Sequence, residues 1–180
     1  MKSERRFVLD RRSLVGGTAA ALLLAASPAG ARPLPPHVNR SLWLLNVNTG
    51  EEIKATFWRR GAWDPVAIEE LDYVMRDWRQ SAVAPIDWRL YTALFELDRR
   101  TDQRGPVRLV SGYRTPETNS ALPGAVSDSF HTKYMASDIW IYGEPLSRLA
   151  RTARSIKAGG VGYYPNSGFI HVDVGPVRTW

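Results

Sequence analysis

The chain has 180 residues, 44% of them hydrophobic, which is enough for one domain with a buried core and too apolar for a disordered chain. It contains no cysteine, so a disulfide framework, a thiolate zinc site and a cysteine nucleophile are all excluded. The formal net charge of +6 would suit an anionic polymer or surface, but half of it lies in the first 31 residues and no nucleic-acid-binding motif accompanies it. We therefore expect no nucleic-acid partner.

The first 31 residues have the pattern of an export signal. Arg11-Arg12 precedes an apolar run from Leu14 to Ala26, and Ala29-x-Ala31 is the small-residue pattern of signal-peptidase cleavage. The arginine pair before a moderately apolar run indicates a Tat-type signal over residues 1–31. The run is shorter than the ~20 apolar residues of a spanning helix, which disfavours an uncleaved anchor. We therefore expect a periplasmic protein with no stable membrane insertion after cleavage.

The mature chain begins with a proline-rich linker, residues 32–40, in which we expect His37 to be exposed and without function. Residues 41–180 are expected to form a single domain. Its first predicted element is a β-hairpin, with strands over 41–47 and 51–58 joined by Asn48-Thr49-Gly50.

Two helices are predicted next. Asp64-Pro65 places an N-cap before a proline at the first helical position, and apolar residues then recur at helical spacing to about Gln80. Asp87 caps the second helix, whose buried side runs from Leu90 to Leu97.

The second half alternates short strands and helices. The predicted elements are a strand beginning at Val107, a helix start at Thr115-Pro116, a strand over 135–142, a helix opened by Glu144-Pro145, and a hairpin over 159–164 and 169–174. This pattern indicates an α+β protein, with helices packed on an antiparallel sheet. Trp140, Tyr163 and Tyr164 are candidates either for lining a groove or for packing in the core.

Two of the three histidines lie in segments that can build one metal site. His131 precedes the 135–142 strand, which carries Asp138, and His171 lies in the 169–174 strand. Strand alternation puts Phe169, His171 and Asp173 on one face, so Asp138 and His171 meet if the two strands pair. A lone histidine in a strand is usually structural. Two imidazoles and one carboxylate together, however, are a sufficient ligand set for zinc with one position left open.

These segments resemble the LAS-type zinc peptidases, which share a Ser-x-His-x(6)-Asp motif and a later ligand histidine, and within that group the murein endopeptidase K branch. The resemblance covers nearly the whole chain. It rests on the runs Asn48-Thr49-Gly50-Glu51, Ser111-Gly112-Tyr113-Arg114, Ser129-Phe130-His131-Thr132-Lys133, Ala158–Pro165 and Phe169–Asp173, with Gly175-Pro176 and Trp180.

The resemblance implies a LAS/hedgehog-like fold and a zinc-dependent enzyme that cleaves peptide bonds of peptidoglycan, such as the bond joining two diaminopimelate residues. The implied zinc ligands are His131, Asp138 and His171. Arg114 matches the family arginine near the scissile carbonyl, where it would stabilise an oxyanion or hold a substrate carboxylate.

The sequence departs from the family pattern around the general base. Related peptidases carry a glutamate three residues before the last ligand histidine, or a histidine two before it; these positions are Gly168 and Phe169 here. Asp173 is therefore either the base or an orienting group for a ligand. Tyr134 stands where the family often has glycine, and we expect it to narrow the cleft or alter specificity.

Two alternatives remain at this point. The missing base residues and Tyr134 are consistent with a non-catalytic peptidoglycan-binding protein on a peptidase scaffold. A carboxypeptidase on the same fold would keep the zinc and change the substrate.

Overall fold

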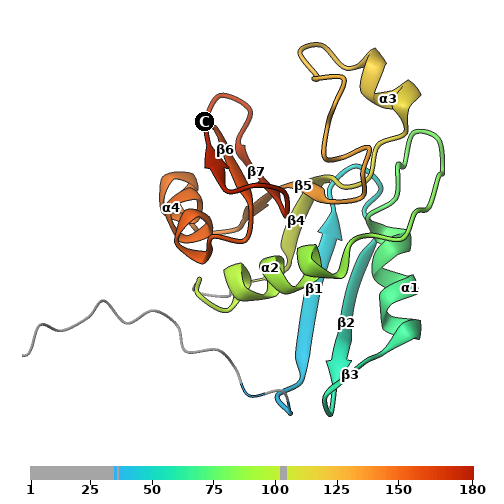
Figure 1. Cartoon of the computed structure of the whole chain (residues 1–180), viewed down its shortest axis with the longest axis vertical. Helices are drawn as coiled ribbons and strands as arrows, with labels where there is room; N and C mark the ends of the chain where they lie inside the picture. Colours follow the sequence, from blue (N-terminus) through green and yellow to red (C-terminus); the bar gives the residue numbers. More distant parts are fainter. Residues whose placement is uncertain (1–34, 36, 102–104) are drawn as a thin grey trace, which may run out of the picture. The chain divides into compact units, whose positions relative to one another are not determined.

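The computed structural model describes Pro35 and residues 37–101 and 105–180, which belong to one compact unit. The predicted export signal, residues 1–31, lies outside the described residues. An eight-stranded sheet runs through the unit in the order β3-β2-β1-β4-β5-β7-β6-β8 (Figure 1). The strands are β1 (Arg40–Asn46), β2 (Glu52–Arg59), β3 (Ala62–Trp63), β4 (Val107–Ser111), β5 (Ala136–Ile141), β6 (Gly160–Tyr164), β7 (Phe169–Asp173) and β8 (Arg178–Thr179).

The α+β class is confirmed, but the sheet is mixed rather than wholly antiparallel. The predicted hairpins β1–β2 and β6–β7 are both present. Strand β4, however, pairs parallel to β1, and β8 pairs parallel to β6. Two helices separate the first hairpin from β4, and a connection of that length lets a strand return in the direction of its neighbour. A prediction from local patterns does not reveal this.

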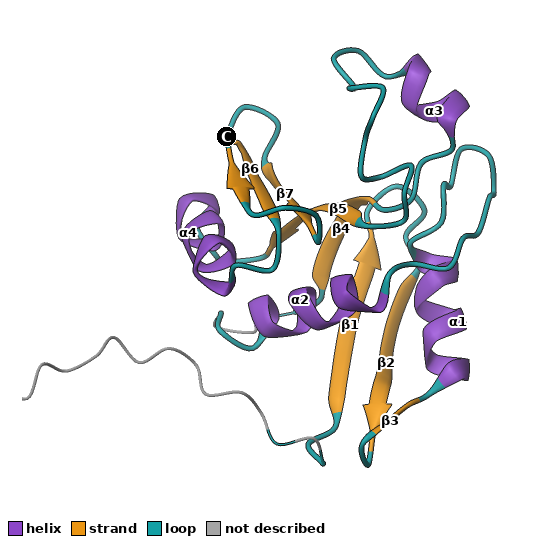
Figure 2. Cartoon of the chain, in the orientation of Figure 1, coloured by secondary structure: helices purple, strands orange, loops and turns teal. Residues whose placement is uncertain are grey.

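Three helices of the described chain pack against the sheet: α1 (Pro65–Val74), α2 (Trp88–Asp98) and α4 (Leu146–Ile156). The short helix α3 (Pro116–Ala121) lies away from the sheet (Figure 1). Helix α2 crosses β1, while α1 lies alongside β2 (Figure 2). As predicted, Asp87 caps α2 by accepting a hydrogen bond from the Arg89 N–H. Leu90 and Leu94 of α2 are fully buried, so this helix supplies much of the core beneath the sheet.

Helix α1 ends at Val74, whereas the sequence pattern predicted an end near Gln80. The chain turns because its next polar groups bond to a distant segment. The carbonyl of Met75 accepts a hydrogen bond from the Tyr113 N–H at 2.8 Å. The buried carboxylate of Asp77 accepts from the N–H groups of Arg79 and Thr115, at 3.1 and 2.9 Å. These contacts join α1 to the chain that leads into the site.

Candidate metal centre

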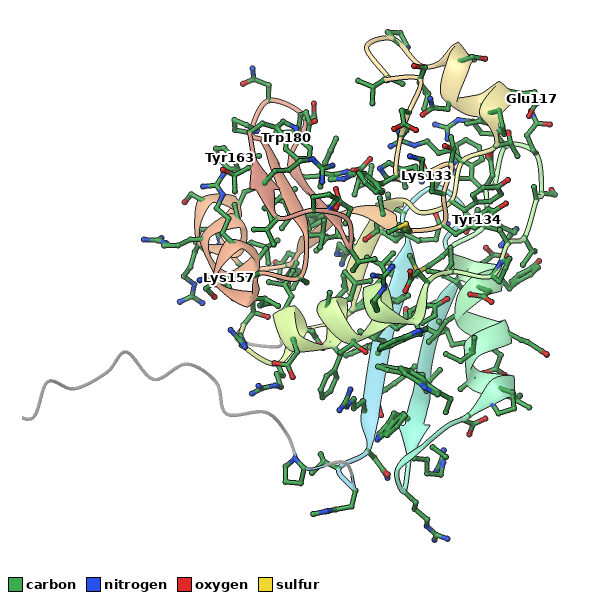
Figure 3. The ribbon with its side chains drawn as sticks, in the orientation of Figure 1. Glu117, Lys133, Tyr134, Lys157, Tyr163 and Trp180 are labelled. Carbon is green, nitrogen blue, oxygen red and sulfur yellow. The ribbon has the colours of Figure 1, made fainter. Side chains whose placement is uncertain are left out.

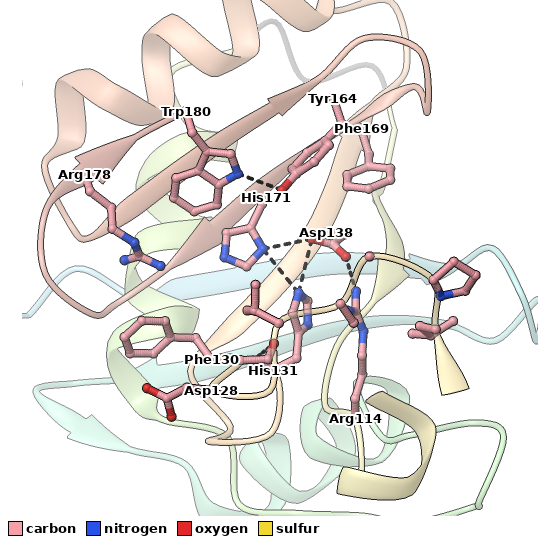
Figure 4. Close-up of a pocket in the computed structure, with 16 residues that line it drawn as sticks. Arg114, Asp128, Phe130, His131, Asp138, Tyr164, Phe169, His171, Arg178 and Trp180 are labelled. Atoms are coloured by element: carbon pink, nitrogen blue, oxygen red, sulfur yellow. Dashed lines mark hydrogen bonds and ion pairs between the residues drawn. The ribbon is translucent and has the colours of Figure 1, made fainter. Parts of the chain in front are cut away.

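Strands β5 and β7 bring two of the predicted ligands together. They are antiparallel neighbours, and their register places Asp138 directly opposite His171. His131 reaches the same point from the turn before β5, as the sequence predicted. One ligand atom from each of these three buried residues lies within 4.8 Å of the other two (Figure 4).

A backbone carbonyl fixes the ring of His131. Its Nδ1 lies 2.7 Å from the carbonyl oxygen of Gly112. Because a carbonyl only accepts, Nδ1 carries the hydrogen and the lone pair of Nε2 faces the site. Glycine is required at this position, since a Cβ at residue 112 would lie 2.2 Å from the carbonyl oxygen of Met75.

Asp173 fixes the ring of His171 through the other ring nitrogen, Nε2. Its Oδ2 lies 3.0 Å from His171 Nε2, so that nitrogen donates and the lone pair of Nδ1 faces the site. The carboxylate also accepts hydrogen bonds from Arg178 and from the N–H groups of Gly160 and Gly175. It is fully buried behind the imidazole, and these contacts favour the orienting role for Asp173.

The resulting donor set fits a metal cation. His131 Nε2 and His171 Nδ1 are 3.2 Å apart, and they lie 3.2 and 3.0 Å from the same Asp138 oxygen. With the two rings held in these tautomers, three lone pairs converge with no hydrogen between them. Tetrahedral bonds of 2.0–2.1 Å, typical of zinc, would place ligand atoms about 3.3 Å apart. The observed spacing is close to that value.

The charges around the centre favour an ionised carboxylate. Burial acts to raise the pKa of Asp138, but the neighbouring His131, His171 and Arg114 hold it well below its usual range. Burial lowers the pKa of His131. Burial also opposes protonation of His171, but hydrogen bonds to Asp138 and Asp173 raise its pKa. A cation therefore competes with a proton at His171, and metal binding should weaken on acidification.

Arg114 lies beside Asp138. Its Nη2 donates to Asp138 Oδ2, and its Nε donates to Ser111 Oγ at 2.7 Å. Burial lowers the pKa of this guanidinium, which the nearby Asp138 charge partly offsets. Arg114 also lines the cleft, so the predicted substrate contact is sterically open to it.

A cleft of about 570 Å³ opens above the three candidate ligands, within the usual size range for ligand sites. The loop 122–126 borders it on one side, and Tyr164, Phe169 and Trp180 border it on another (Figure 4). Of the three aromatic candidates for a groove, Tyr164 lines the cleft. Tyr163 instead packs against the core, and Trp140 lies beneath the guanidinium of Arg108.

The expectation that Tyr134 narrows the cleft is wrong. Its side chain is absent from the cleft lining and packs against Tyr113, with ring centroids 4.9 Å apart. Figure 3 shows it well separated from the cleft residue Trp180. The backbone keeps the left-handed conformation that favours glycine, with φ at 62°. Tyrosine therefore retains the turn between the candidate ligands at some cost in strain.

Apart from Asp173, sequence patterns did not reveal the groups that support the candidate ligands. Arg178 forms a hydrogen-bonded ion pair with Asp173, and the Gly112 carbonyl orients His131. Trp180 matched the family pattern, but its position 5.3 Å from the His171 ring was not predicted. The available sequence signal was Gly112 in the Ser111–Arg114 run, because a glycine there indicates that the backbone approaches another group closely.

Comparison with known proteins places this site in a family. The family described as "Peptidoglycan L,D-endopeptidase MepK" matches residues 36–180. A relative of that name from Escherichia coli K12 is 39% identical across 97% of this chain and 99% of its own length. The chain belongs to this family. A "Probable peptidoglycan L,D-endopeptidase MepK" from Haemophilus influenzae is 38% identical across 78% of both chains. No solved structure matches the chain.

Family membership confirms the resemblance to the murein endopeptidase K branch that the motifs indicated. The matched region spans all of the residues of the candidate centre, including Asp173 and its partner Arg178. The site and the family thus point to the same chemistry.

Proposed function

We propose that this chain is an exported, zinc-dependent endopeptidase that hydrolyses peptide bonds in peptidoglycan stem peptides or cross-links. The main support for a zinc site is the convergence of His131 Nε2, His171 Nδ1 and Asp138 Oδ1. Hydrogen bonds on the opposite nitrogen of each ring fix both tautomers. The relatives are named L,D-endopeptidases. We accordingly assign the cleavage to an L,D bond, such as the bond joining two diaminopimelate residues.

Some of these side chains would hold the metal ion, and others would hold the substrate. A zinc ion bound by His131, Asp138 and His171 would polarise the scissile carbonyl and lower the pKa of a water toward ~7. Asp173 keeps the proton of His171 on Nε2 and so keeps the ligand lone pair available. Arg114 faces the cleft from beside Asp138, where its charge can bind a substrate carbonyl or carboxylate.

We assign Asp173 to orientation rather than to proton transfer from water. Its oxygens accept five hydrogen bonds on the far side of the His171 ring, and it does not line the cleft. Among the described residues, the carboxylates that do line the cleft are Asp138 and Asp128. Asp128 is paired with Lys133 at 2.5 Å, and its side chain is 84% exposed.

Export is part of the proposal. We propose that residues 1–31 form a Tat-type signal, that residues 32–40 form a linker, and that residues 41–180 form one LAS-type peptidase domain in the periplasm. The twin arginine and the Ala29-x-Ala31 pattern support the signal. Within the part of the chain that the structure describes, no helix has the length and apolar character needed to cross a bilayer.

Digestion of purified cross-linked muropeptides, followed by mass spectrometry, tests the function. The zinc-loaded wild-type protein should release products with the masses expected for cleavage of an internal L,D bond. His171→Ala should release none, and a chelator should stop the wild-type reaction until zinc is restored. Absence of products from linear and cross-linked substrates would refute the proposal.

A non-catalytic role is the second candidate, because Gly168 and Phe169 stand at the usual base positions. It predicts binding to cell-wall sacculi that persists after chelation and in His131→Ala, with no cleavage. Release of single carboxy-terminal residues would instead indicate a carboxypeptidase.

A further inference from the structure

An aromatic pair, Tyr164 and Trp180, forms one wall of the cleft beside the candidate ligands. The β6–β7 register pairs Gly162 with His171 and Tyr164 with Phe169. Because side chains alternate along a strand, Tyr164 lies on the same face of the sheet as His171. Trp180 contacts both, with its ring centroid 5.3 Å from that of His171 and a hydrogen bond to Tyr164.

Gly162 makes room for this pair. A Cβ at residue 162 would lie 2.7 Å from ring atoms of both Trp180 and Tyr164, a distance too short for any side chain. The Tyr164 ring also packs against Phe169, with centroids 5.0 Å apart. The Tyr164 ring is thus held by Phe169 and by Trp180.

The hydrogen bond within the pair orients the Tyr164 hydroxyl. Trp180 Nε1 lies 2.6 Å from the Tyr164 oxygen. An indole N–H can only donate, so the tyrosine oxygen accepts and its own hydrogen must point elsewhere. Within the described part of the chain, that hydrogen makes no hydrogen bond. The hydroxyl end of the side chain extends toward His171 and Asp138 in the cleft (Figure 4).

We propose that Tyr164 is a catalytic residue, whose hydroxyl donates a hydrogen bond to the oxygen of the scissile carbonyl as negative charge develops there. The inference rests on the proposed endopeptidase function. Tyr164 keeps its proton throughout. Water supplies the hydroxyl that bonds to the acyl carbon, the C–N bond breaks with its electron pair on nitrogen, and the second proton of the water ends on the released amine.

Arg114 explains why a second donor is needed. Its guanidinium is already engaged by the Asp138 carboxylate and by Ser111, so much of its charge is neutralised. A neutral donor fixed by an indole requires no such partner and no reorganisation during the reaction. Removing one oxyanion donor from a peptidase lowers kcat by roughly 10²–10³-fold. Since Arg114 and the metal share the charge here, we expect a fall of about 10–100-fold.

The test uses Tyr164→Phe, which keeps the ring and its packing on Phe169 and removes the hydroxyl alone. Tyr163→Phe is the matched control, because that tyrosine is next in the same strand and packs against the core. Zinc-loaded proteins are compared for kcat and KM on a cross-linked muropeptide, for zinc content, and for affinity toward a phosphinate peptide that mimics the tetrahedral transition state.

Tyr164→Phe should lower kcat about 10–100-fold and weaken phosphinate binding by a similar factor. Its KM and zinc content should match those of the wild type, and Tyr163→Phe should behave as the wild type in every measurement. Trp180→Phe, which removes the orienting N–H, should show a smaller loss of the same kind.

Two results would overturn the inference. One is a kcat and a phosphinate affinity for Tyr164→Phe within about twofold of the wild type; the other is a loss of zinc that accounts for the lost activity. Failure of the proposed function is distinct, because the wild-type protein itself would then release no product.

Discussion

Replacing Asp173 by asparagine tests the most specific electrostatic feature of the site. The carboxylate accepts hydrogen bonds from His171, from Arg178 and from the Gly160 and Gly175 amides. Asparagine has the same shape, but one of its terminal atoms donates. The amide oxygen will stay with the two backbone N–H groups, which leaves the NH₂ group facing His171 Nε2. That nitrogen must then accept, and the imidazole proton moves to Nδ1, the candidate ligand atom.

Two losses follow from this change. Altering a group that orients a ligand histidine typically weakens metal binding 10–100-fold, or about 1.4–2.7 kcal/mol. The metal-free protein should also unfold more easily, because Arg178 loses its ionic partner. Breaking a buried pair costs roughly 3–5 kcal/mol. The Arg178 side chain is 38% exposed, so we expect a smaller value of about 2 kcal/mol.

Competition for zinc with a chromophoric chelator measures the first loss, and urea unfolding of the metal-free protein measures the second. Asp98→Asn, a substitution of the same kind away from the centre, is the control for zinc binding. Zinc affinity of Asp173→Asn within about twofold of the wild type would refute the orienting role. If activity were nevertheless lost, Asp173 would be the general base, the alternative that the sequence left open.

Three further outcomes follow from particular residues. Gly112→Ala should bind zinc at least tenfold more weakly in the same competition assay, because its Cβ would displace the carbonyl that orients His131. Tyr134→Gly should be more stable than Tyr134→Ala by about 1 kcal/mol in urea unfolding, since residue 134 has a positive φ; equal stabilities would contradict this. Burial raises the pKa of Asp98 from 3.8 to about 6, so the native state retains a proton that the unfolded state has released. The free energy of unfolding should therefore fall between about pH 4 and pH 6 through this group, and Asp98→Asn should stabilise the protein by about 1–2 kcal/mol above pH 6 and little at pH 4; a gain that did not depend on pH would refute this assignment.

The sequence was sufficient for features that depend on local spacing. Alternation along the last hairpin put His171 and Asp173 on one face, and the capping residue Asp87 marked the start of α2. The sequence was insufficient where hydrogen bonds between distant segments determine the local structure. The helical pattern beyond Val74 is overridden because Asp77 bonds to the Thr115 N–H, 38 residues away. The parallel pairing of β1 with β4 has a similar origin, since strand partners are chosen by the fold rather than by the flanking turns.

The net charge of the residues around the centre affects how a bound metal ion would act. Each of the two carboxylates has an arginine: Arg114 pairs with Asp138, and Arg178 pairs with Asp173. With neutral histidines, these four charged groups sum to zero, so a divalent cation would bring an uncompensated charge of two into a buried site. Such a site holds its metal less tightly than one with unpaired carboxylates, but leaves the ion more strongly polarising toward a carbonyl oxygen. It also attracts anionic peptides, which connects the arrangement of the arginines to the acidic cross-links of the proposed substrate.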